Sequence, residues 1–386
     1  MHMKVEPNQQ NKQQCYGLWK DCFGDSDQYM NYYFTEKTKD NEIFQIERDG
    51  EVISMLHLNP FTFLVNGVTQ KLNYIVGVAT KESERGQGLM RTVLTDTLCR
   101  QAERGEAFTY LMPAAKEIYL PYDFRYMYTQ SRVTGVLALK EEMAVTMQEV
   151  KAEPAVSYES LTDEEKEQVV LFVNEKLQAS FDCVVLRDKA YYERLCKEMQ
   201  AAGGNVVVAR QAGRLLGVCA FMLENGHIEV VETITTPSDT REVLTKLNAF
   251  LQEEYEEVSL QAAWLETYFL DKEALFSELE EAKEVEQPII MARLLHLEHA
   301  FSLLRQKEGA EPSNIVVCIE DPIIKANQKT FAIEGTADGI KISETNEEPA
   351  LTVAIAELTE WYFGVREIPQ LQGIQTLTSP YINDIV

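Results

Sequence analysis

The sequence lacks the features that would mark a membrane or exported protein. A helix that crosses a bilayer needs roughly twenty consecutive apolar residues. The longest apolar stretch, residues 206–223, is broken by two arginines and a glutamine. The N-terminal segment MHMKVEPNQQNKQQ has no apolar centre of the kind that a secretory signal requires. We therefore expect a soluble protein of the cytoplasm.

Cysteine and histidine do not occur in metal-binding or disulfide patterns. The seven cysteines are odd in number and are never spaced C-x-x-C, which argues against a disulfide framework or a zinc knuckle and favours reduced thiols. His296 and His299 are three residues apart, but no third ligand accompanies them. The sequence predicts no metal site.

Basic residues are scarce, since 36 Lys and Arg stand against 62 Asp and Glu, for a formal charge of −26. Such a field repels nucleic acid and anionic lipid and attracts cations. We expect no nucleic acid or membrane partner, and a substrate that is an amine or polyamine. The competing explanation is that the acidity only aids solubility.

Residues 42–105 contain turn signals between apolar runs. Asp49-Gly50 and Asn66-Gly67 are typical of two-residue hairpin turns. They predict four antiparallel segments, at 43–48, 51–58, 61–65 and 68–80. A glycine loop, an amphipathic helix from Leu89 that ends at Gly105, and a strand at 107–112 follow.

Residues 206–253 repeat the same order of strands, turns and helix, with Ala212-Gly213 and Asn225-Gly226 at the turns. This pattern indicates an internal duplication. The second copy has PSDTREVL where the first has ESERGQGLMR, so only the first copy keeps the glycines. We expect only the first copy to bind a ligand there.

From Ile289 the pattern changes to a predicted helix at 291–306 and short strands at 314–320, 330–335 and 340–344. It indicates a small α+β unit with its own core. The predicted fold is therefore α+β (mixed α/β), with units at 1–150, 151–287 and 288–386. The acidic run at 278–288 marks the second boundary.

The segment KESERGQGLMR (81–91) places two glycines between a strand and a helix. A helix N-terminus presents unpaired amides and the positive end of the helix dipole, which suit a phosphate. The sequence has neither G-x-x-x-x-G-K-[ST] nor G-x-G-x-x-G at this point. The antiparallel strands before it also argue against a dinucleotide-binding βαβ unit.

In this context the segment resembles the GNAT superfamily of acetyl-CoA dependent N-acetyltransferases. That family has the loop Q/R-x-x-G-x-G/A, which Arg85 and Gly88 match, while Met90 stands where a small residue is usual. The resemblance implies a loop whose amides hold the coenzyme A pyrophosphate. The coenzyme A contacts that it implies are Val78, Ala79, Thr80, Arg85, Gly86, Gln87, Gly88, Leu89, Met90 and Arg91.

The layout of the whole chain is similar to that of the Eis (enhanced intracellular survival) family, in which two tandem acetyltransferase domains precede a sterol-carrier-like unit. The resemblance implies a direct acetyl transfer in which the free carboxylate of the last residue, here Val386, acts as a base. It also implies a hexamer, because known members that acetylate aminoglycosides form hexamers.

A tyrosine is the expected proton donor to the departing thiolate. The superfamily pattern Y-x-x-x-G-F aligns with residues 119–124, which gives Tyr119 this role. In the Eis family the donor stands at the position of Phe124, which cannot donate a proton. The donor is therefore Tyr119 or, if the alignment slips by two residues, Tyr126.

We predict an acetyl-CoA dependent N-acetyltransferase that acts on a cationic amine such as an aminoglycoside, a polyamine or a lysine-like compound. One alternative is a non-catalytic module that binds acetyl-CoA or, in the C-terminal unit, a lipid. A second alternative is an assembly scaffold.

Overall fold

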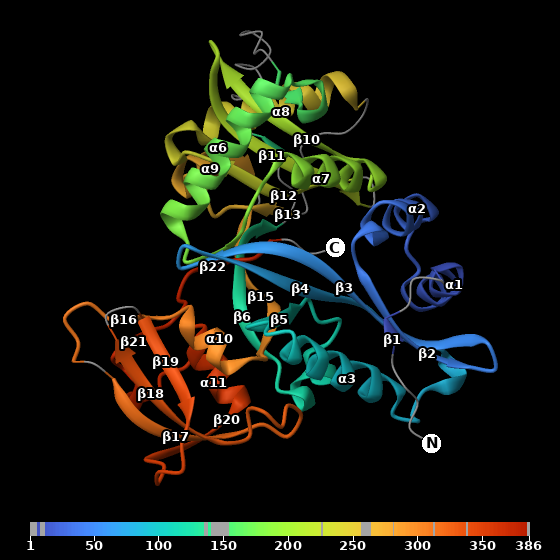
Figure 1. Cartoon of the computed structure of the whole chain (residues 1–386). Coiled ribbons are helices and arrows are strands. Elements are labelled where there is room, and N and C mark those ends of the chain that lie inside the picture. The colour runs from blue at the N-terminus through green and yellow to red at the C-terminus, as the bar shows by residue number, and fades with distance from the viewer. Residues whose placement is uncertain are drawn as a thin grey trace.

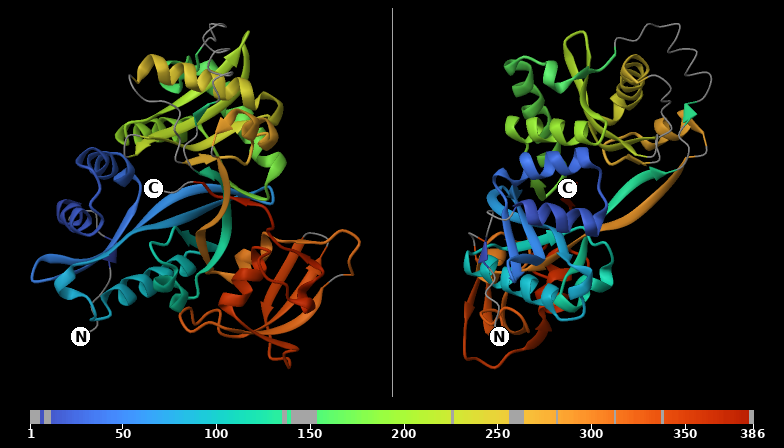
Figure 2. Two further views of the ribbon diagram at one scale, coloured as in Figure 1. Left: turned by 180° about the vertical axis from the view of Figure 1, so that it is seen from behind. Right: turned by 90° about the vertical axis from the view of Figure 1, so that its right-hand side faces the viewer.

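The structure is a computed structural model that describes residues 6–7, 12–134, 138–139, 154–224, 227–255, 264–280, 282–311, 313–336 and 339–383. Three units follow one another (Figures 1 and 2). We call them the first unit (12–134 together with strand β15), the second unit (154–280) and the third unit (297–377). The C-terminal tail (378–383) returns to the middle of the molecule (Figure 1).

The first unit is a twisted sheet with helices on its faces. Its main elements are α1 (Lys12–Phe23), α2 (Asp27–Thr35), β2 (Glu42–Arg48), β3 (Glu51–Val65), β4 (Val68–Thr80), α3 (Leu89–Glu103), β5 (Phe108–Leu111), α4 (Lys116–Tyr119) and β6 (Arg125–Thr134). Both predicted hairpin turns are confirmed, since Asp49, Gly50, Asn66 and Gly67 all have positive φ. Gly105, with φ +80, follows the end of α3 as expected.

The prediction of four antiparallel segments is wrong at one point, because 51–58 and 61–65 form the single strand β3. Pro60 does not interrupt it. On one side, Pro60 pairs with Asn73 of β4. On the other, the partner strand β2 ends opposite Leu58 and the next partner begins opposite Phe63. No neighbouring strand therefore needs the N–H that proline lacks.

The second unit repeats the first. Its strands and helix β10 (Asn205–Gln211), β11 (Arg214–Glu224), β12 (His227–Thr235), α8 (Thr240–Glu254) and β13 (Trp264–Glu266) follow the order of β2, β3, β4, α3 and β5. β12 and β13 are parallel, as β4 and β5 are. The predicted duplication is confirmed, although the turn at Asn225-Gly226 lies outside the described residues.

The further elements of the second unit are β8 (Val156–Ser157), α6 (Asp163–Ser180), β9 (Cys183–Val185), α7 (Lys189–Ala201) and α9 (Lys272–Glu278). Of these, β9 and α7 contact the first unit. β9 pairs antiparallel with the end of β3, from Phe63 to Val65. β6 of the first unit pairs with β13 of the second. The two units therefore share one continuous sheet.

Strand β15 (Lys283–Leu294) lies between β5 and β6 and so completes the sheet of the first unit. The predicted helix at 291–306 is therefore wrong over 291–294, and the helix there, α10, covers only Leu297–Ser302. Residues 289–294 are all buried. A strand buried on both faces has a continuous apolar sequence, which periodicity does not distinguish from a buried helix. β15 spans the predicted 287/288 boundary, and both predicted boundaries remain predictions.

The third unit has a separate four-stranded sheet in the order β19–β18–β17–β20. Its elements are α10, β17 (Asn314–Glu320), β18 (Thr330–Thr336), β19 (Gly339–Glu344), β20 (Leu351–Ala354) and α11 (Ile355–Tyr362). Together with the units above, this confirms the predicted mixed α/β class. Among the described helices, none is both long and apolar enough to cross a membrane.

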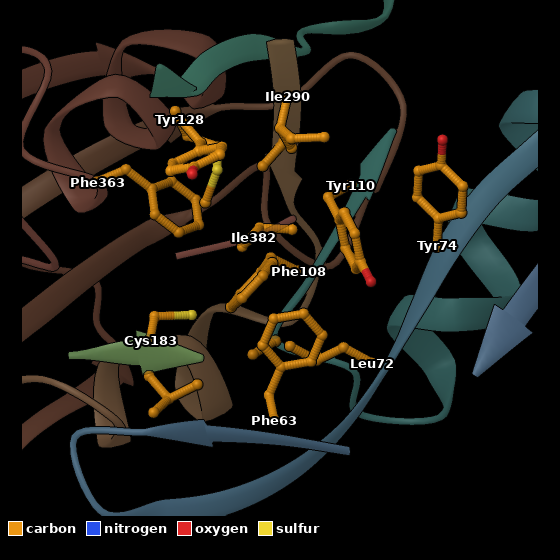
Figure 3. Close-up of a cluster of buried hydrophobic side chains, with 14 of the residues drawn as sticks. Phe63, Leu72, Tyr74, Phe108, Tyr110, Tyr128, Cys183, Ile290, Phe363 and Ile382 are labelled. Carbon is orange, nitrogen blue, oxygen red and sulfur yellow. The ribbon is translucent and has the colours of Figure 1, made fainter. Parts of the chain in front are cut away.

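The tail joins the core of the molecule. Its strand β22 (Pro380–Tyr381) pairs in parallel with β9. Figure 3 shows Ile382 beside Phe108 and Cys183, within a cluster that also includes Phe63 and Phe363. Ile382 is completely buried. All three units and the tail therefore contribute to a single apolar cluster.

Candidate active site

The glycine loop leaves a row of backbone amides unpaired at the start of α3. Gly86 and Gly88 have φ +79 and +78, and a Cβ at either position would meet open space. The first bond of the helix runs from the Thr92 amide to the Gly88 carbonyl, at 3.0 Å. Among the described residues no acceptor faces the amides of 86–91. This loop therefore fits an anion such as a diphosphate.

Hydrogen bonds between side chains hold the loop in place. The carboxylate of Glu84 accepts hydrogen bonds from Arg48 and, at 2.9 Å, from the Gln87 side chain. Arg85 is exposed, and its Nε donates to the carbonyl of Thr80 at 3.2 Å. Arg91 is also exposed, so two guanidinium groups stand near the unpaired amides. Their charge favours a bound phosphate group.

β4 and β5 separate just before this loop. They share a single parallel register pair, Tyr74 with Tyr110. β4 then continues to Thr80. Residues 75–80 pair with β3 on one side, and on the other side no described strand pairs with them. Val78, Ala79 and Thr80 lie on this stretch. An extended ligand can bind to such an open strand edge through main-chain hydrogen bonds.

A β-bulge at Gly77 and Val78 bends the open part of β4. These two residues face the single residue Leu56 of β3. Gly77 has φ +61, and a Cβ there would lie 2.3 Å from the Trp19 ring, so only glycine fits. The sequence analysis missed Gly77, although an isolated glycine within a strand pattern is itself a signal of a bulge.

Tyr119, one of the two predicted proton donors, lies at this opening. Its side chain is buried, and burial raises its pKa to about 12. Its ring packs against Phe124 with centroids 5.9 Å apart. Burial raises the pKa of Tyr74, the Met112 amide opposes this shift, and the charge of Tyr119 adds to it. Sequence reasoning gave no role to Tyr74, which resembles any other strand aromatic.

Tyr126, the other predicted donor, lies on β6 and is half-buried. Burial, followed by the charge of Glu117, raises its pKa. Tyr128, on the same face of β6, instead contacts the tail, with its ring centroid 6.2 Å from that of Tyr381. Of the three tyrosines, Tyr119 is the one whose charge contributes to the raised pKa of Tyr74.

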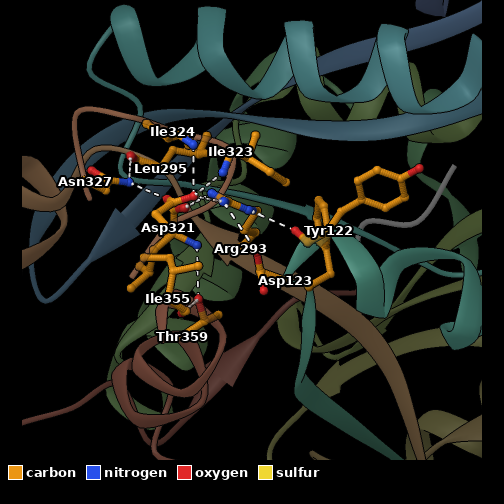
Figure 4. A network of polar contacts seen from close by, with 12 residues as sticks. Tyr122, Asp123, Arg293, Leu295, Asp321, Ile323, Ile324, Asn327, Ile355 and Thr359 are labelled. Carbon is orange, nitrogen blue, oxygen red and sulfur yellow. Dashed lines mark hydrogen bonds and ion pairs between the residues drawn. The ribbon is translucent and has the colours of Figure 1, made fainter. Parts of the chain in front are cut away.

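A buried ion pair holds the segment that carries Tyr119 (Figure 4). Arg293 of β15 is fully buried, donates to the carbonyl of Tyr122 at 2.9 Å and bonds Asp321 of the third unit at 2.6 Å. Asp321 also accepts from the amides of Ile323 and Ile324 and from Asn327. The third unit thus fixes the turn that follows Tyr119.

The predicted base, Val386, lies outside the described residues, but the tail is described to Asn383. The carboxylate of Asp182 accepts from the amides of Thr378 and Ser379 at 2.7 and 3.1 Å. Asn383 accepts from Gln130 of β6 at 2.7 Å and donates to the Val231 carbonyl of β12 at 2.6 Å. The tail is therefore anchored to both of the first two units.

A pocket of about 910 Å³ opens between the first and second units and reaches Asn383. α2, β3 and the segment after α2 form one wall, and α6, β9 and α7 form the other. Pro60, which lines this pocket, pairs with Asn73 of β4, and Asn73 directly precedes Tyr74, where β4 and β5 share their register pair. The pocket therefore begins close to the point where β4 and β5 separate.

The second copy has no comparable anion site. The residues before α8 form a short turn at Pro237–Asp239 without glycine. The carboxylate of Asp239 stands at the start of α8 and pairs with Arg214 at 2.9 Å. A carboxylate at a helix N-terminus competes with a phosphate for the same potential. These contacts agree with the prediction that only the first copy binds a ligand.

The two histidines considered as metal ligands have structural partners. The His296 ring accepts from the His299 amide and so caps α10, and His299 contacts the Gly105 carbonyl. Within the described ranges no group of three potential ligands is close enough to hold a metal ion.

Comparison with known families identifies two parts of the chain. Residues 6–127 match the family described as an acetyltransferase (GNAT) domain. Residues 6–127 thus form a GNAT acetyltransferase domain. Residues 297–384 match the sterol carrier protein domain family. The chain is therefore an acyltransferase of the GNAT fold with a sterol-carrier-like third unit. A comparison with curated proteins finds no match.

Several solved structures share the fold of this chain over nearly its full length. A probable N-acyltransferase from Enterococcus faecalis is 16% identical with a TM-score of 0.72, covering 97% of this chain and 94% of its own. A GCN5-related N-acetyltransferase from Kribbella flavida is 14% identical with a TM-score of 0.72, covering 100% of both chains. Eis1 from Mycobacterium abscessus is 12% identical with a TM-score of 0.64, also covering 100% of both.

Proposed function

We propose that the first unit transfers the acetyl group of acetyl-CoA directly to a cationic amine, in the manner of the Eis enzymes. Two features that lie close together carry this proposal. The backbone amides of 86–91 have no hydrogen-bond partner among the described residues, and the edge of β4 next to them has no partner strand. The amides and Arg85 would hold the diphosphate, and residues 76–80 would hold the extended arm that follows it. Acetyl-CoA, when bound, supplies the reactive thioester.

Tyr119 is the proton donor that the geometry favours. It is buried at the end of α4, shortly after β5, and its charge acts on Tyr74, the residue where β4 and β5 share their register pair. Because burial raises its pKa to about 12, the phenol keeps its proton at neutral pH and can give it to a departing thiolate. Tyr126 remains the second candidate, and it lies farther along the chain on β6.

The carboxylate of Val386 is the proposed base that takes a proton from the incoming ammonium. The support is the anchoring of the tail, since Asn383 lines the pocket between the units. Three further residues span at most about 10 Å when extended. A carboxyl group that leaves water for such a site gains basicity.

The net charge of −26 supports a cationic acceptor, whose approach it would accelerate. Aminoglycosides, polyamines and lysine-like amines are the classes to test. As in the Eis enzymes, the proposal includes a hexamer and a place in the cytoplasm.

A thiol-release assay with acetyl-CoA and one member of each amine class tests the proposal. We expect turnover with at least one class, and loss of turnover when a few residues extend the chain beyond Val386. The same residues added at the N-terminus serve as the control. A folded protein that acetylates no amine, or keeps full activity with the extended end, would contradict the proposal.

A further inference from the structure

We propose that the pocket between the first and second units receives the apolar body of the acceptor, so that the preferred substrate is an amine with one positive charge on an apolar group and not a polycation. This inference rests on the proposed function, because it assigns the acceptor to the pocket that begins close to the point where β4 and β5 separate.

The walls of the pocket offer apolar surface from both units. Pro60 and Phe61 of β3 face Leu195 and Met199 of α7 across it. Leu171 of α6 also lines the pocket, and its side chain is 64% exposed. An acceptor with an apolar body would cover this surface, and each added methylene group that becomes buried strengthens binding roughly fourfold.

All but one of the described charged groups that line the pocket have a partner of opposite sign. The three ion pairs are Lys37 with Glu198 at 3.5 Å, Arg194 with Asp40 at 2.8 Å, and Arg187 with Glu232 at 2.7 Å. Lys37 also lies over the Phe61 ring, 5.0 Å from its centroid, and the remaining carboxylate, Asp188, caps α7 through the Tyr191 amide. The three ion pairs cancel, and Asp188 leaves the pocket with one net negative charge, which a single ammonium group would balance.

The charge balance of the pocket distinguishes polycationic acceptors from monoamines. A polycation would carry its extra ammonium groups into the pocket, where each would lose water and compete with a lysine or arginine for a carboxylate. A monoamine leaves only its apolar body there, while its single ammonium faces the Tyr74 and Tyr119 side. The acidic surface then attracts both kinds of amine, and the pocket selects between them.

Steady-state acetylation with the full chain tests this selection. We expect kcat/KM to rise roughly threefold to fourfold per methylene from n-butylamine to n-hexylamine. We also expect 2-phenylethylamine to exceed spermidine and kanamycin by about tenfold or more, since each buried unpaired charge costs at least one power of ten. Equal or better turnover of spermidine or kanamycin would overturn the inference and leave the proposed function intact.

A charge variant at the pocket mouth provides the second test. Leu171→Asp adds an unpaired carboxylate at an exposed site, where folding should tolerate it, and should lower kcat/KM for n-hexylamine while raising it for spermidine. Val365→Asp is the matched control, because Val365 is 57% exposed and lies in the third unit away from the pocket. Identical amine preferences in both variants would contradict the inference.

A binding measurement distinguishes this inference from the proposed function. Calorimetry of n-hexylamine and spermidine with the protein in the presence of coenzyme A needs no turnover. If n-hexylamine binds more tightly than spermidine and Leu171→Asp weakens this binding, the inference is supported, even when no amine is acetylated. The absence of acetylation would overturn only the proposed function. Tighter binding of spermidine overturns the inference.

Discussion

At the scale of single residues, glycines with the same backbone conformation serve different purposes. Gly88 and Gly50 have φ +78 and +82, and both would place a Cβ in open space. Gly88 starts α3 beside the unpaired amides, whereas Gly50 lies in the hairpin between β2 and β3. A substitution at either one strains the backbone, but only one should affect a ligand.

We expect Gly88→Val to raise the Kd for acetyl-CoA about tenfold or more, because a β-branched residue at positive φ shifts the amides and costs about 1–3 kcal/mol. Gly50→Val should lower the thermal stability similarly and leave the Kd unchanged. Calorimetric titration of both variants decides this, and an equal Kd in the two would remove the loop from the site.

Tyr119→Phe should lower kcat about a hundredfold, since it removes a general acid, with little change in the Kd for acetyl-CoA. The matched variant Tyr126→Phe should retain most of the activity. Because the pKa of Tyr119 is raised to about 12, its proton should not limit kcat between pH 8 and 10. A large loss in Tyr126→Phe with little loss in Tyr119→Phe would reverse the assignment.

Glu266 gives a prediction about pH and stability. It is fully buried, accepts from the Tyr268 amide at 2.6 Å, and burial raises its pKa to about 8. Between its unfolded pKa of about 4.3 and its folded value, the folded state binds more protons than the unfolded state. The free energy of unfolding should therefore fall as the pH rises through this window.

Glu266→Gln, which stays neutral, should be more stable than the wild type by about 2–4 kcal/mol at pH 9 and should differ little below pH 4. Urea unfolding across this range measures the effect, and exposed Glu286→Gln is the control. If the free energy of unfolding of the wild type instead rises from pH 5 to pH 8 relative to that of Glu266→Gln, the Glu266 carboxylate is ionised in the folded state and the prediction is wrong.

The glycine loop could be predicted from its residue types, whereas the residues and the pocket around it could not. Gly86 and Gly88 stand out because few other residues adopt positive φ. Tyr74 does not stand out, since its role comes from β5 separating from β4 at that residue. The pocket depends on α7 of the other unit, and no local pattern indicates which helix will face β3.

At the scale of elements, one carboxylate holds the start of the tail, ahead of the strand pairing with β9 and the Asn383 hydrogen bonds. Asp182 bonds two tail amides and also donates its own amide to the Ser379 carbonyl at 3.0 Å. Tyr381 then packs its ring 4.8 Å from that of Phe181. The tail should therefore separate from β9 when the carboxylate is removed.

Asp182→Ala should cost about 1–3 kcal/mol, because two amides lose their acceptor. Amide hydrogen exchange should become faster at residues 378–383, and kcat should fall if the end of the chain takes part in the reaction. Asp182→Asn keeps an acceptor oxygen and should restore part of both. Unchanged exchange in the alanine variant would show that β22 is held by packing alone.

The success of element prediction depended on where the determining forces act. The hairpins were predicted because their turn residues fix a local backbone conformation. Residues 291–294 were wrongly predicted as helix because burial on both faces of β15 comes from β5 and β6, which are more than 150 residues away in the sequence. The predicted break between 51–58 and 61–65 was wrong for the same reason, since it depends on where the strands beside Pro60 begin and end.

At the scale of the whole molecule, the sheet of the first unit needs a strand from much later in the chain. β15, from Lys283 to Leu294, separates β5 from β6 in the sheet. We therefore expect a fragment of residues 1–150 to be unfolded or aggregated, because two strands would lose their neighbour. Circular dichroism and limited proteolysis, with the full chain as the reference, test this. A fragment that folds and binds acetyl-CoA would contradict the expectation.

The pairing of β9 with β3 also bears on how such a chain can change over generations. A duplicate that no longer holds a nucleotide would ordinarily accumulate substitutions without harm. Here its short strand pairs with β3 of the first unit, and its helix α7 lines the pocket that we propose for the acceptor. Natural selection on the reaction therefore extends to the inactive copy, and new substrate preferences can arise there while the acetyl-transfer machinery stays untouched.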